Sequence, residues 1–339
     1  MVTLRQVAER AGVSIKTVSR IVNADPAVKP QTREAVLGHL KDMNYVPDQA
    51  ARLMRSGTSN FVGLMTDAVA TTPYSVDIVR GAQAELKRVH KTLLIANTDG
   101  DPELEAEYWR MFRAQKAAAV IYAAMYHRPQ SMGHPDFSGP VVLANCFSKE
   151  GDRASIIPDD EGGGYAQADH LLKLGHRRIG LITLNPAIAA TMLRGRGIKR
   201  AYREHGVTFD FDLERIGYTG PLMNETMVTF EAAIGLLQRK NRPTAIICGN
   251  DKIALQVFSA AAHLSLSVPG DLSVMGYDDL TVISETLRPS LTTVALPYFQ
   301  IGKMAVEMAQ LASTEPEGWA PKVLVPCPLV IRESCRALV

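Results

Sequence analysis

The segment that decides the fold of the N-terminal region comprises residues 3–23 and reads TLRQVAERAGVSIKTVSRIVN. Apolar residues recur at helical spacing on both sides of a single glycine, which favours two short helices joined by a turn. Thr3 and Ser14 stand where these helices would begin, and their hydroxyl groups can accept hydrogen bonds from the first backbone amides. We therefore expect helices over residues 4–11 and 15–22, arranged as a helix-turn-helix.

The second of these helices presents a polar outer face that carries no acidic residue. Lys16, Thr17 and Arg20 on this face suit phosphates and base edges. Residues 1–60 also hold nine Lys and Arg against five Asp and Glu, whereas the remainder holds 28 against 30, so the basic charge is concentrated near the N-terminus. We interpret residues 1–46 as a DNA-binding domain; a small helical bundle without a DNA role is the alternative.

A linker follows this domain. Pro30 can open a third helix, which Asn44 would end. Residues 47–60 then read PDQAARLMRSGTSN, and their helix-favouring part, about eight residues long, is too short to be stable alone. We expect residues 47–56 to be unstructured in the free protein and helical on DNA.

From residue 61 onward, apolar strand-like runs alternate with helical stretches. Strands are expected at 61–65, 93–96, 119–122, 141–144, 179–183, 215–218, 245–248 and 273–276. Helices are expected at 76–89, 103–114, 164–174, 197–205, 230–239 and 252–264. Such alternation is typical of parallel sheets covered by helices, and two series of similar length indicate two lobes. Because ligands bind beyond the carboxyl ends of parallel strands, two facing lobes would form a cleft.

The composition fits a globular chain. Hydrophobic residues make up 46% and charged residues 21%, as in proteins with a real core. Four widely spaced cysteines follow no metal-ligand pattern, so we expect free thiols, mostly buried, at Cys146, Cys248, Cys327 and Cys335.

Enzyme and membrane classes are disfavoured. The sequence contains no G-x-S-x-G, phosphate-binding loop or H-E-x-x-H motif, so we expect neither catalysis nor a metal or cofactor. Residues 1–10 are charged and lack the apolar stretch of a signal peptide, and no apolar run reaches the roughly 18 residues of a membrane span. These features predict a cytoplasmic protein.

An ordered series of segments resembles the LacI/GalR family of bacterial regulators. After the opening segment come NTDGDPELEAEY (97–108), GHRRIGLIT (175–183), PTAIICGNDKIAL (243–255), VPGDLSVMGYDDL (268–280), RPSLTTV (288–294) and LVIRES (329–334). The series spans essentially the whole chain. The resemblance implies a helix-turn-helix headpiece, a hinge helix over residues 47–60, and an α/β core over residues 61–339 with two Rossmann-like lobes, similar to periplasmic sugar-binding proteins.

In this family the chain crosses between the lobes about three times. The resemblance implies crossings near Asp160, Leu291 and Lys322. Lobe 1 would then comprise residues 61–160 and 292–321, and lobe 2 residues 161–291 and 322–339. Members bind near-palindromic operators as homodimers, and an effector changes lobe closure and the spacing of the headpieces. Since the sequence stops at Val339, without room for an added leucine-repeat helix, we expect a dimer and no tetramer.

The resemblance places base-reading positions on the second helix. Ile15, Lys16 and Arg20 match them, although simple phosphate contact is the alternative for the two cations. Met54 matches an apolar wedge for the minor groove; packing of the two hinge helices is the alternative. The full set of expected DNA-binding residues is Thr3, Ser14, Ile15, Lys16, Thr17, Ser19, Arg20, Asn23, Ala51, Arg52 and Met54.

In the core, Arg194 and Asp278 match recurrent effector-contacting positions. A guanidinium and a carboxylate in one cleft suit the hydroxyl groups of a sugar or a sugar acid; a salt bridge between the two is the alternative. Asp251 is expected to cap the following helix. The expected effector-binding residues are Tyr74, Ser75, Asn145, Arg194, Asn250, Asp278 and Tyr298. Residues 219–227, TGPLMNETM, do not match the family pattern cleanly.

These observations predict a dimeric repressor of carbohydrate or sugar-acid utilisation genes, released from double-stranded operator DNA by a small inducer. A corepressor-dependent regulator would use the same cleft. A periplasmic sugar-binding protein is a further alternative, disfavoured by the N-terminal helix-turn-helix.

Overall fold

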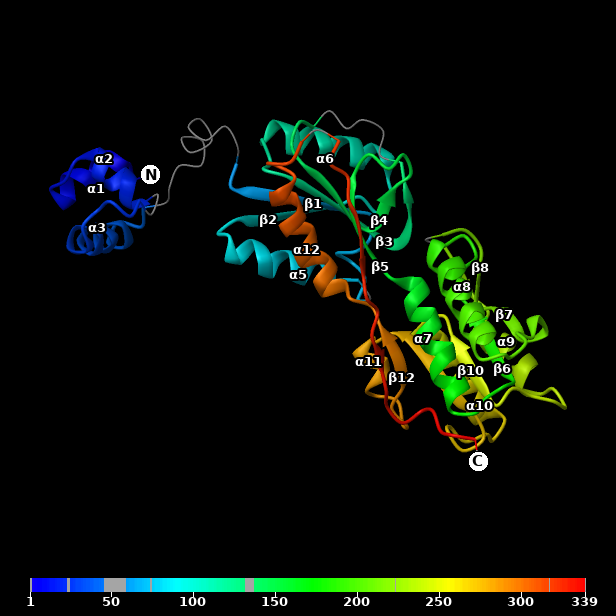
Figure 1. Ribbon diagram of the computed structural model, residues 1–339. Helices are drawn as coiled ribbons and strands as arrows, with labels where there is room; N and C mark the ends of the chain where they lie inside the picture. The colour runs from blue at the N-terminus through cyan, green and yellow to red at the C-terminus, as the bar shows by residue number, and fades with distance from the viewer. Residues whose placement is uncertain are drawn as a thin grey trace. The chain divides into compact units, whose positions relative to one another are not determined.

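The structure is a computed structural model that describes residues 2–22, 25–45, 59–73, 75–131, 137–222, 224–316 and 318–338. The chain divides into two compact units, residues 1–59 (the headpiece) and 60–339 (the core), shown in Figure 1. Some predicted site residues, Asn23, Ala51, Arg52, Met54 and Tyr74, lie outside the described residues, as does the predicted hinge helix apart from residues 59–60.

The headpiece contains the three predicted helices, α1 (Leu4–Ala11), α2 (Ile15–Val22) and α3 (Pro30–Asp42). Thr3 Oγ1 accepts a hydrogen bond from the Gln6 amide at 3.3 Å, and the Gln6 side chain accepts one from the Thr3 amide, which completes a capping box. Gly12 ends α1 with φ of 63°, a left-handed conformation that glycine adopts without strain. The buried core of the unit consists of Val7, Ala8, Val18, Ile21 and Val36.

Lobe 1 of the core is a six-stranded parallel sheet in the order β13-β5-β4-β3-β1-β2. Its strands are β1 (Phe61–Thr66), β2 (Thr92–Asn97), β3 (Val120–Gln130), β4 (Val141–Ser148), β5 (Ala154–Pro158) and β13 (Lys322–Val325). Its helices are α5 (Asp77–Arg88), α6 (Pro102–Ala114) and α12 (Tyr298–Leu311). Figure 1 shows α5 and α12 over one face and α6 over the other, with an apolar core on each side of the sheet.

Lobe 2 is a second six-stranded sheet, in the order β14-β12-β11-β10-β6-β7, parallel except for β14. Its strands are β6 (Ile179–Thr183), β7 (Glu214–Ile216), β10 (Ala245–Cys248), β11 (Ser273–Asp278), β12 (Thr292–Ala295) and β14 (Leu329–Val330). Its helices are α7 (Asp160–Lys173), α8 (Ala189–Glu204), α9 (Thr229–Leu237), α10 (Asp251–His263) and the short α11 (Thr281–Ser284). A two-stranded hairpin, β8 (Tyr218–Thr219) and β9 (Thr226–Met227), stands apart from both sheets.

The crossings between the lobes confirm the first predicted position and correct the other two. The chain passes from β5 into α7 at Asp160, as expected. β12 belongs to the sheet of lobe 2, so the second crossing follows Ala295 and not Leu291. β13 pairs with β5 in lobe 1, so the third crossing follows Val325. The predicted positions lay several residues early because each fell at the start of a strand that the chain completes before it crosses.

Two helices begin earlier than predicted, because glycines inside them were taken as boundaries. α7 begins at Asp160 and α8 at Ala189. A side chain at Gly164 would meet the Arg194 carbonyl oxygen at 2.3 Å, and one at Gly197 would meet the Glu161 carbonyl oxygen at 1.9 Å. These glycines therefore let the two helices pack backbone against backbone, and they do not end either helix.

The sequence also predicted free cysteine thiols and no membrane-spanning segment. All four cysteines are free thiols; Cys146, Cys248 and Cys327 are buried, and Cys335 is partly exposed. Within the part of the chain that the structure describes, no helix is both long and apolar enough to cross a bilayer.

Candidate functional site

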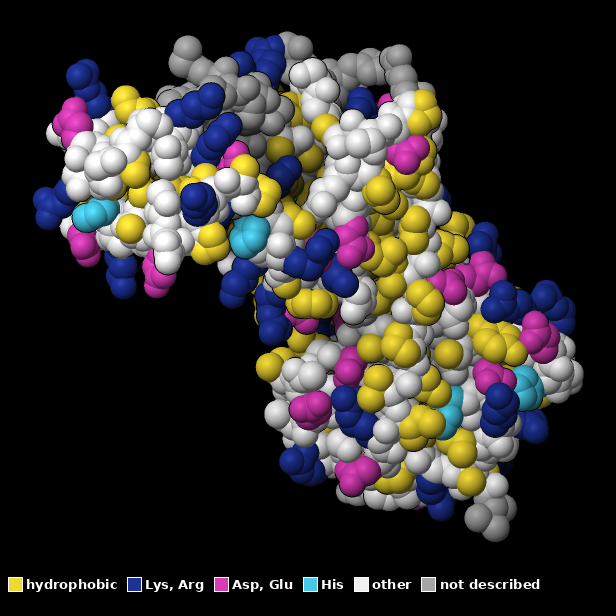
Figure 2. All heavy atoms as spheres, turned by 60° about the vertical axis from the view of Figure 1, so that its left-hand side comes forward, with side chains coloured by type: hydrophobic (Ala, Val, Ile, Leu, Met, Phe, Trp, Pro, Cys, Tyr) yellow, Lys and Arg dark blue, Asp and Glu magenta, His cyan; other side chains and the backbone are white. Residues whose placement is uncertain are grey.

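The outer face of α2 is exposed as predicted. Val18 and Ile21 point into the headpiece core, while Lys16 and Arg20 are exposed and Ile15 retains 48% of its accessible surface. An apolar side chain this exposed on a short helix is available for contact with a base methyl group. Figure 2 shows Lys and Arg side chains spread over the headpiece surface, with several acidic side chains among them.

The hydroxyl groups on this face already have local partners. Ser14 Oγ accepts a hydrogen bond from the Thr17 amide at 3.1 Å and lies 2.9 Å from Thr17 Oγ1. Thr3 is likewise used by its capping box. These residues therefore fix where α1 and α2 begin, and any phosphate contact they make is additional to that role.

An acidic residue from the following loop reaches the predicted base-reading face. Asp25 Oδ2 lies 3.5 Å from Arg20 Nε, in an ion pair whose two side chains are both partly exposed. An exposed pair of this kind contributes little to stability. It orients the Arg20 guanidinium before DNA arrives, and a phosphate or a guanine edge would compete with it.

In the core, a cavity with about 680 Å³ of empty space, part of it open to solvent, lies between the two lobes. Five predicted effector residues line it: Asn145, Arg194, Asn250, Asp278 and Tyr298. Six polar residues that were not predicted also line it: Tyr126, His127, Asp160, Tyr218, Glu225 and Lys252. Ser75 is not among the lining residues; its buried hydroxyl group lies 3.0 Å from Thr72 Oγ1, and its effector role stays a prediction.

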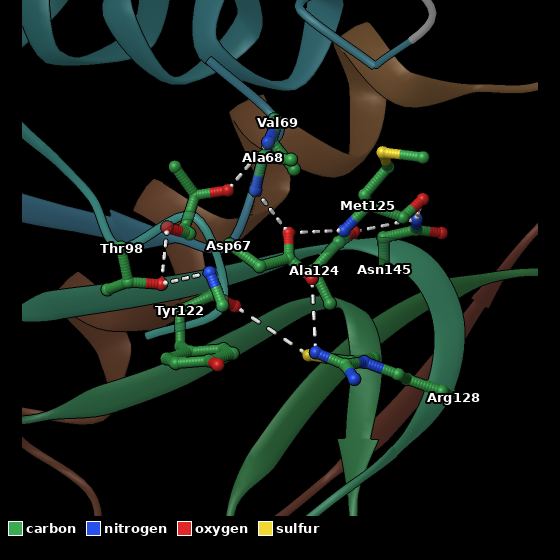
Figure 3. Close-up of polar contacts among 12 residues, drawn as sticks. Asp67, Ala68, Val69, Thr98, Tyr122, Ala124, Met125, Arg128 and Asn145 are labelled. Atoms are coloured by element: carbon green, nitrogen blue, oxygen red, sulfur yellow. Dashed lines mark hydrogen bonds and ion pairs between the residues drawn. The ribbon is translucent and has the colours of Figure 1, made fainter. Parts of the chain in front are cut away.

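An irregularity in β3 forms the lobe 1 wall of the cavity. The pairing of β3 with β4 shifts register between Ala123 and Arg128, so the intervening residues leave the regular strand. Figure 3 shows how they are held: Asp67 Oδ1 accepts a hydrogen bond from the Met125 amide at 2.9 Å, and Asp67 Oδ2 accepts one from Arg128 at 3.0 Å. This bulge places Tyr126 and His127 in the cavity.

Asn145 on β4 supports the same bulge. Its side-chain Nδ2 donates to the carbonyl oxygens of Ala124 at 2.9 Å and Met125 at 3.0 Å (Figure 3). Its Oδ1 is buried and has no hydrogen-bond partner among the described residues. Asn145 also has φ of 57°, a left-handed conformation that a strand residue rarely adopts. The side chain is therefore both a support for the bulge and an open acceptor in the cavity.

Arg194 does not form the alternative salt bridge with Asp278. Its Nε donates to Asp160 Oδ1 at 2.7 Å, its Nη1 donates to the Gly249 carbonyl oxygen at 2.6 Å, and its guanidinium lies 3.5 Å from the centre of the Tyr277 ring. Asp160 Oδ2 lies 2.6 Å from His127 Nδ1. Burial opposes ionisation of Asp160, but the charge of Arg194 and the hydrogen bond with His127 outweigh it and lower the pKa of this carboxyl. The pair of Asp160 with His127 joins lobe 2 to lobe 1.

Asp278 is the carboxylate that remains open. No hydrogen bond or ion pair of its side chain is present among the described residues, and it ends β11 with φ of 113°. Burial raises its pKa to about 7, although the charges of Arg194 and Lys252 act in the opposite direction. A strained backbone and an unpaired acidic group in a cavity mark a position kept for binding.

The helix cap predicted at Asp251 is formed by its neighbour Asn250, which also lines the cavity. Asn250 caps α10, since its Oδ1 accepts a hydrogen bond from the Ile253 amide at 2.9 Å. Asp251, which was expected to be the cap, instead accepts hydrogen bonds from Thr293 Oγ1 and from the Leu280 amide, each at 2.7 Å. Asp251 therefore ties α10 to the loop after Asp278 and holds that carboxylate in place.

Comparison with known proteins agrees with this architecture. Residues 3–48 match the family described as bacterial regulatory proteins, lacI family, and residues 168–335 match the periplasmic binding protein-like domain. The sucrose operon repressor of Escherichia coli is 31% identical over 339 residues, with 98% of this chain and all of that protein covered. The chain belongs to the LacI family. It is a DNA-binding transcription regulator with an N-terminal helix-turn-helix and an effector-domain fold.

Solved structures of LacI-family proteins confirm the predicted fold. A putative LacI-family regulator from Rhizobium etli is 40% identical with a TM-score of 0.77, covering 82% of this chain and 99% of that one. The lac repressor dimer bound to operator is 27% identical with a TM-score of 0.79, covering 99% of each chain. These relatives are transcription regulators.

The resemblance to the LacI family predicted Arg194 and Asp278 as effector-contacting residues, because each lies in a helix or strand, α8 and β11 respectively. His127 could not be found this way, since it lies in a bulge that apolar alternation does not reveal. Glu225 lies in the segment that lacks a clean family match. The polar run Tyr126-His127-Arg128, which follows an apolar strand in the sequence, was the available signal for the bulge.

Proposed function

We propose that this protein represses genes of carbohydrate use by binding operator DNA as a homodimer, and that a sugar or sugar acid in the core cavity releases it. The single observation that carries the proposal is the unpaired, strained Asp278 carboxylate in the cavity between the lobes. Support comes from relatives named as repressors of the sucrose and ribose operons and from a relative solved as a dimer on operator. Chromosomal DNA as a partner implies a cytoplasmic location.

The DNA-binding part of the proposal rests on α2. Ile15, Lys16 and Arg20 read base edges, and Ser14, Thr17 and Ser19 position the helix on phosphates. Thr3 acts through the start of α1, while Asn23, Ala51, Arg52 and Met54 complete the surface by resemblance alone. The effector part rests on Asn145, Arg194, Asn250, Asp278 and Tyr298, with Tyr74 added by resemblance. We assign no catalytic role to either part.

The test begins by selecting the preferred duplex from random DNA with the full chain. Its affinity is then measured by fluorescence anisotropy with and without each member of a panel of sugars and sugar acids. We expect one compound to weaken operator binding. A compound that strengthens it would make the protein corepressor-dependent, and absence of any sequence preference would overturn the proposal.

Asp278→Ala checks the site in the same assay. A ligand donor whose charged acceptor is deleted typically binds more weakly by about 1–3 kcal/mol. We expect the variant to bind operator like the wild type and to need about tenfold or more effector for release. An unchanged effector concentration would show that the ligand binds elsewhere.

A further inference from the structure

The hairpin of β8 and β9 is firmly rooted in lobe 2. At its base, the Val228 amide and the Thr229 hydroxyl group both donate to the Gly217 carbonyl oxygen at 2.9 Å. Nearer its tip, Asn185 Nδ2 donates to the Gly220 carbonyl oxygen, also at 2.9 Å. The hairpin therefore moves with lobe 2. In Figure 1, β8 lies beside α8.

The far end of this hairpin touches lobe 1. Tyr126 in the β3 bulge donates from its hydroxyl group to Glu225 Oε2 at 2.7 Å. Both residues line the cavity, and both are half-buried. Burial and the neighbouring Glu225 raise the pKa of Tyr126, so the hydroxyl group stays protonated and remains a donor. The hydrogen bond thus closes one side of the cavity by joining the two lobes.

The second oxygen of Glu225 is left open. Oε1 is buried and has no hydrogen-bond partner among the described residues. A buried carboxylate oxygen without a donor is unfavourable, so such a group is retained where a donor arrives from outside. Asn145 Oδ1 and the Asp278 carboxylate present two further open acceptors to the same cavity.

The charges around the cavity point to the class of ligand. Three carboxylates line it, at Asp160, Glu225 and Asp278, against the two cations Arg194 and Lys252. Arg194 is already held by Asp160 and Gly249. A ligand carboxylate near Glu225 would be repelled, whereas hydroxyl or ammonium donors would satisfy the open acceptors.

We propose that Glu225 is a specificity-determining residue of the effector cavity: its Oε2 fastens the hairpin to Tyr126, and its Oε1 accepts a hydrogen bond from a hydroxyl or ammonium group of the ligand. This assignment rests on the proposed function, in which the cavity binds a small effector. In this role, Glu225 favours the binding of neutral sugars and amino sugars over that of sugar acids. Glu225 lies in residues 219–227, the segment without a clean family match.

The fastening of the hairpin is tested without any ligand. Tyr126→Phe removes the hydroxyl donor, and we expect amide hydrogen exchange in residues 218–228 to accelerate severalfold. Tyr165→Phe is the matched control, because Tyr165 donates to Glu204 in an equally long 2.7 Å hydrogen bond that lies within lobe 2. Unchanged exchange in Tyr126→Phe, or equal acceleration in both variants, would overturn the fastening.

The selectivity is tested with matched ligands. Galactose, galacturonate and galactosamine, the glucose series, and common neutral disaccharides are titrated against the full chain while the melting temperature is recorded. We expect neutral or amino sugars to stabilise the protein, and each uronate to bind at least about tenfold more weakly than its neutral counterpart. In Glu225→Gln that ratio should fall about tenfold, whereas Glu231→Gln, an exposed position just after the hairpin, should keep it.

Three results would overturn the assignment: a uronate that binds the wild type as tightly as its neutral counterpart, an unchanged ratio in Glu225→Gln, or no stabilisation by any neutral or amino sugar. Operator binding is measured in parallel. A sugar that binds with the expected selectivity but leaves operator affinity unchanged would overturn the proposed function and leave the role of Glu225 standing.

Discussion

The headpiece and the core cavity organise their functional side chains in opposite ways. On α2 the candidate DNA contacts are exposed, lie within seven residues of one another, and have at most weak or local partners. In the cavity the polar groups are buried or half-buried and come from distant segments; Asp160 and His127, for instance, are 33 residues apart. Substitutions on the DNA-binding face can therefore leave the fold of the headpiece intact, whereas the residues of the effector site also stabilise the core.

The largest expected effect comes from Asp160→Ala, which tests whether the cavity is structural. The substitution leaves Arg194 and His127 buried without their carboxylate, and removal of one partner of a buried pair lowers the free energy of unfolding by about 3–5 kcal/mol. Urea denaturation followed by circular dichroism measures the loss. Asp77→Ala breaks an exposed 2.8 Å pair with Arg80 and should lose less than about 1 kcal/mol. Similar losses in both variants would show that the buried pairs of Asp160 stabilise the core no more than an exposed ion pair does.

The second prediction concerns pH. The pKa of Asp278 is about 7 in the folded protein and 3.8 in its ordinary environment, so folding favours the protonated form. That stabilisation is fully present at low pH and disappears as the pH rises from about 4 through 7. Burial is the main cause of the raised pKa; among the charged groups around this carboxyl, Arg194 and Lys252 lower its pKa, whereas the carboxylates of Asp160 and Asp251 oppose its ionisation.

Asp278→Asn, which cannot ionise, measures this linkage. We expect its urea midpoint to exceed that of the wild type by an amount that grows between pH 4 and 7 and is constant above pH 8. A constant difference throughout would mean that Asp278 titrates normally and that its burial is less complete than the structure indicates. No comparable pH response is expected from Arg20→Ala in the headpiece.

The third prediction concerns Arg20→Ala. Loss of one good base contact reduces discrimination between operator and scrambled DNA by about 1–3 kcal/mol. Anisotropy at one fixed salt concentration measures both affinities, and circular dichroism should show an unchanged fold because the Arg20 ion pair with Asp25 is exposed. Equal weakening on both DNAs would identify Arg20 as a phosphate contact.

The smallest effect is expected from Thr3→Ala. The change removes the acceptor for the Gln6 amide, and loss of such a cap destabilises a helix by about 1 kcal/mol. Amide exchange in residues 4–11 should accelerate, and binding to operator and scrambled DNA should weaken together. Thr3→Ser keeps the oxygen and should behave like the wild type. A selective loss on operator would give Thr3 a direct base contact.

The same contrast explains what could be predicted from the sequence. Helices α1 and α2 were predicted to the residue, because Thr3, Ser14 and Gly12 are local signals for their ends. Most strands of the core were also predicted, since each is a short apolar run. Five strands, β5, β9, β12, β13 and β14, are additions to the predicted set, and β3 proved much longer than expected.

Within the cavity, resemblance supplied Arg194 and Asp278 but not their partners. Arg194 was expected to meet the ligand or Asp278; it is bound to Asp160 instead, a pairing fixed by the close packing of α7 on α8. His127 and Glu225 depend on a bulge and on a hairpin without a clean family match. Such contacts follow from three-dimensional packing, so local sequence rules do not contain them.

The strand order of lobe 1 also bears on how the chain is made. Its sheet is completed by β13 and covered by α12, both of which lie between residues 298 and 325, and the edge of β5 stays unpaired until they emerge from the ribosome. The sheet of lobe 2 likewise stays incomplete until β12 and β14, in the same late part of the chain, have been synthesised. The headpiece, by contrast, is continuous from α1 to α3 and can fold first. A nascent chain thus carries a finished DNA-binding face before either half of its cavity can respond to a ligand.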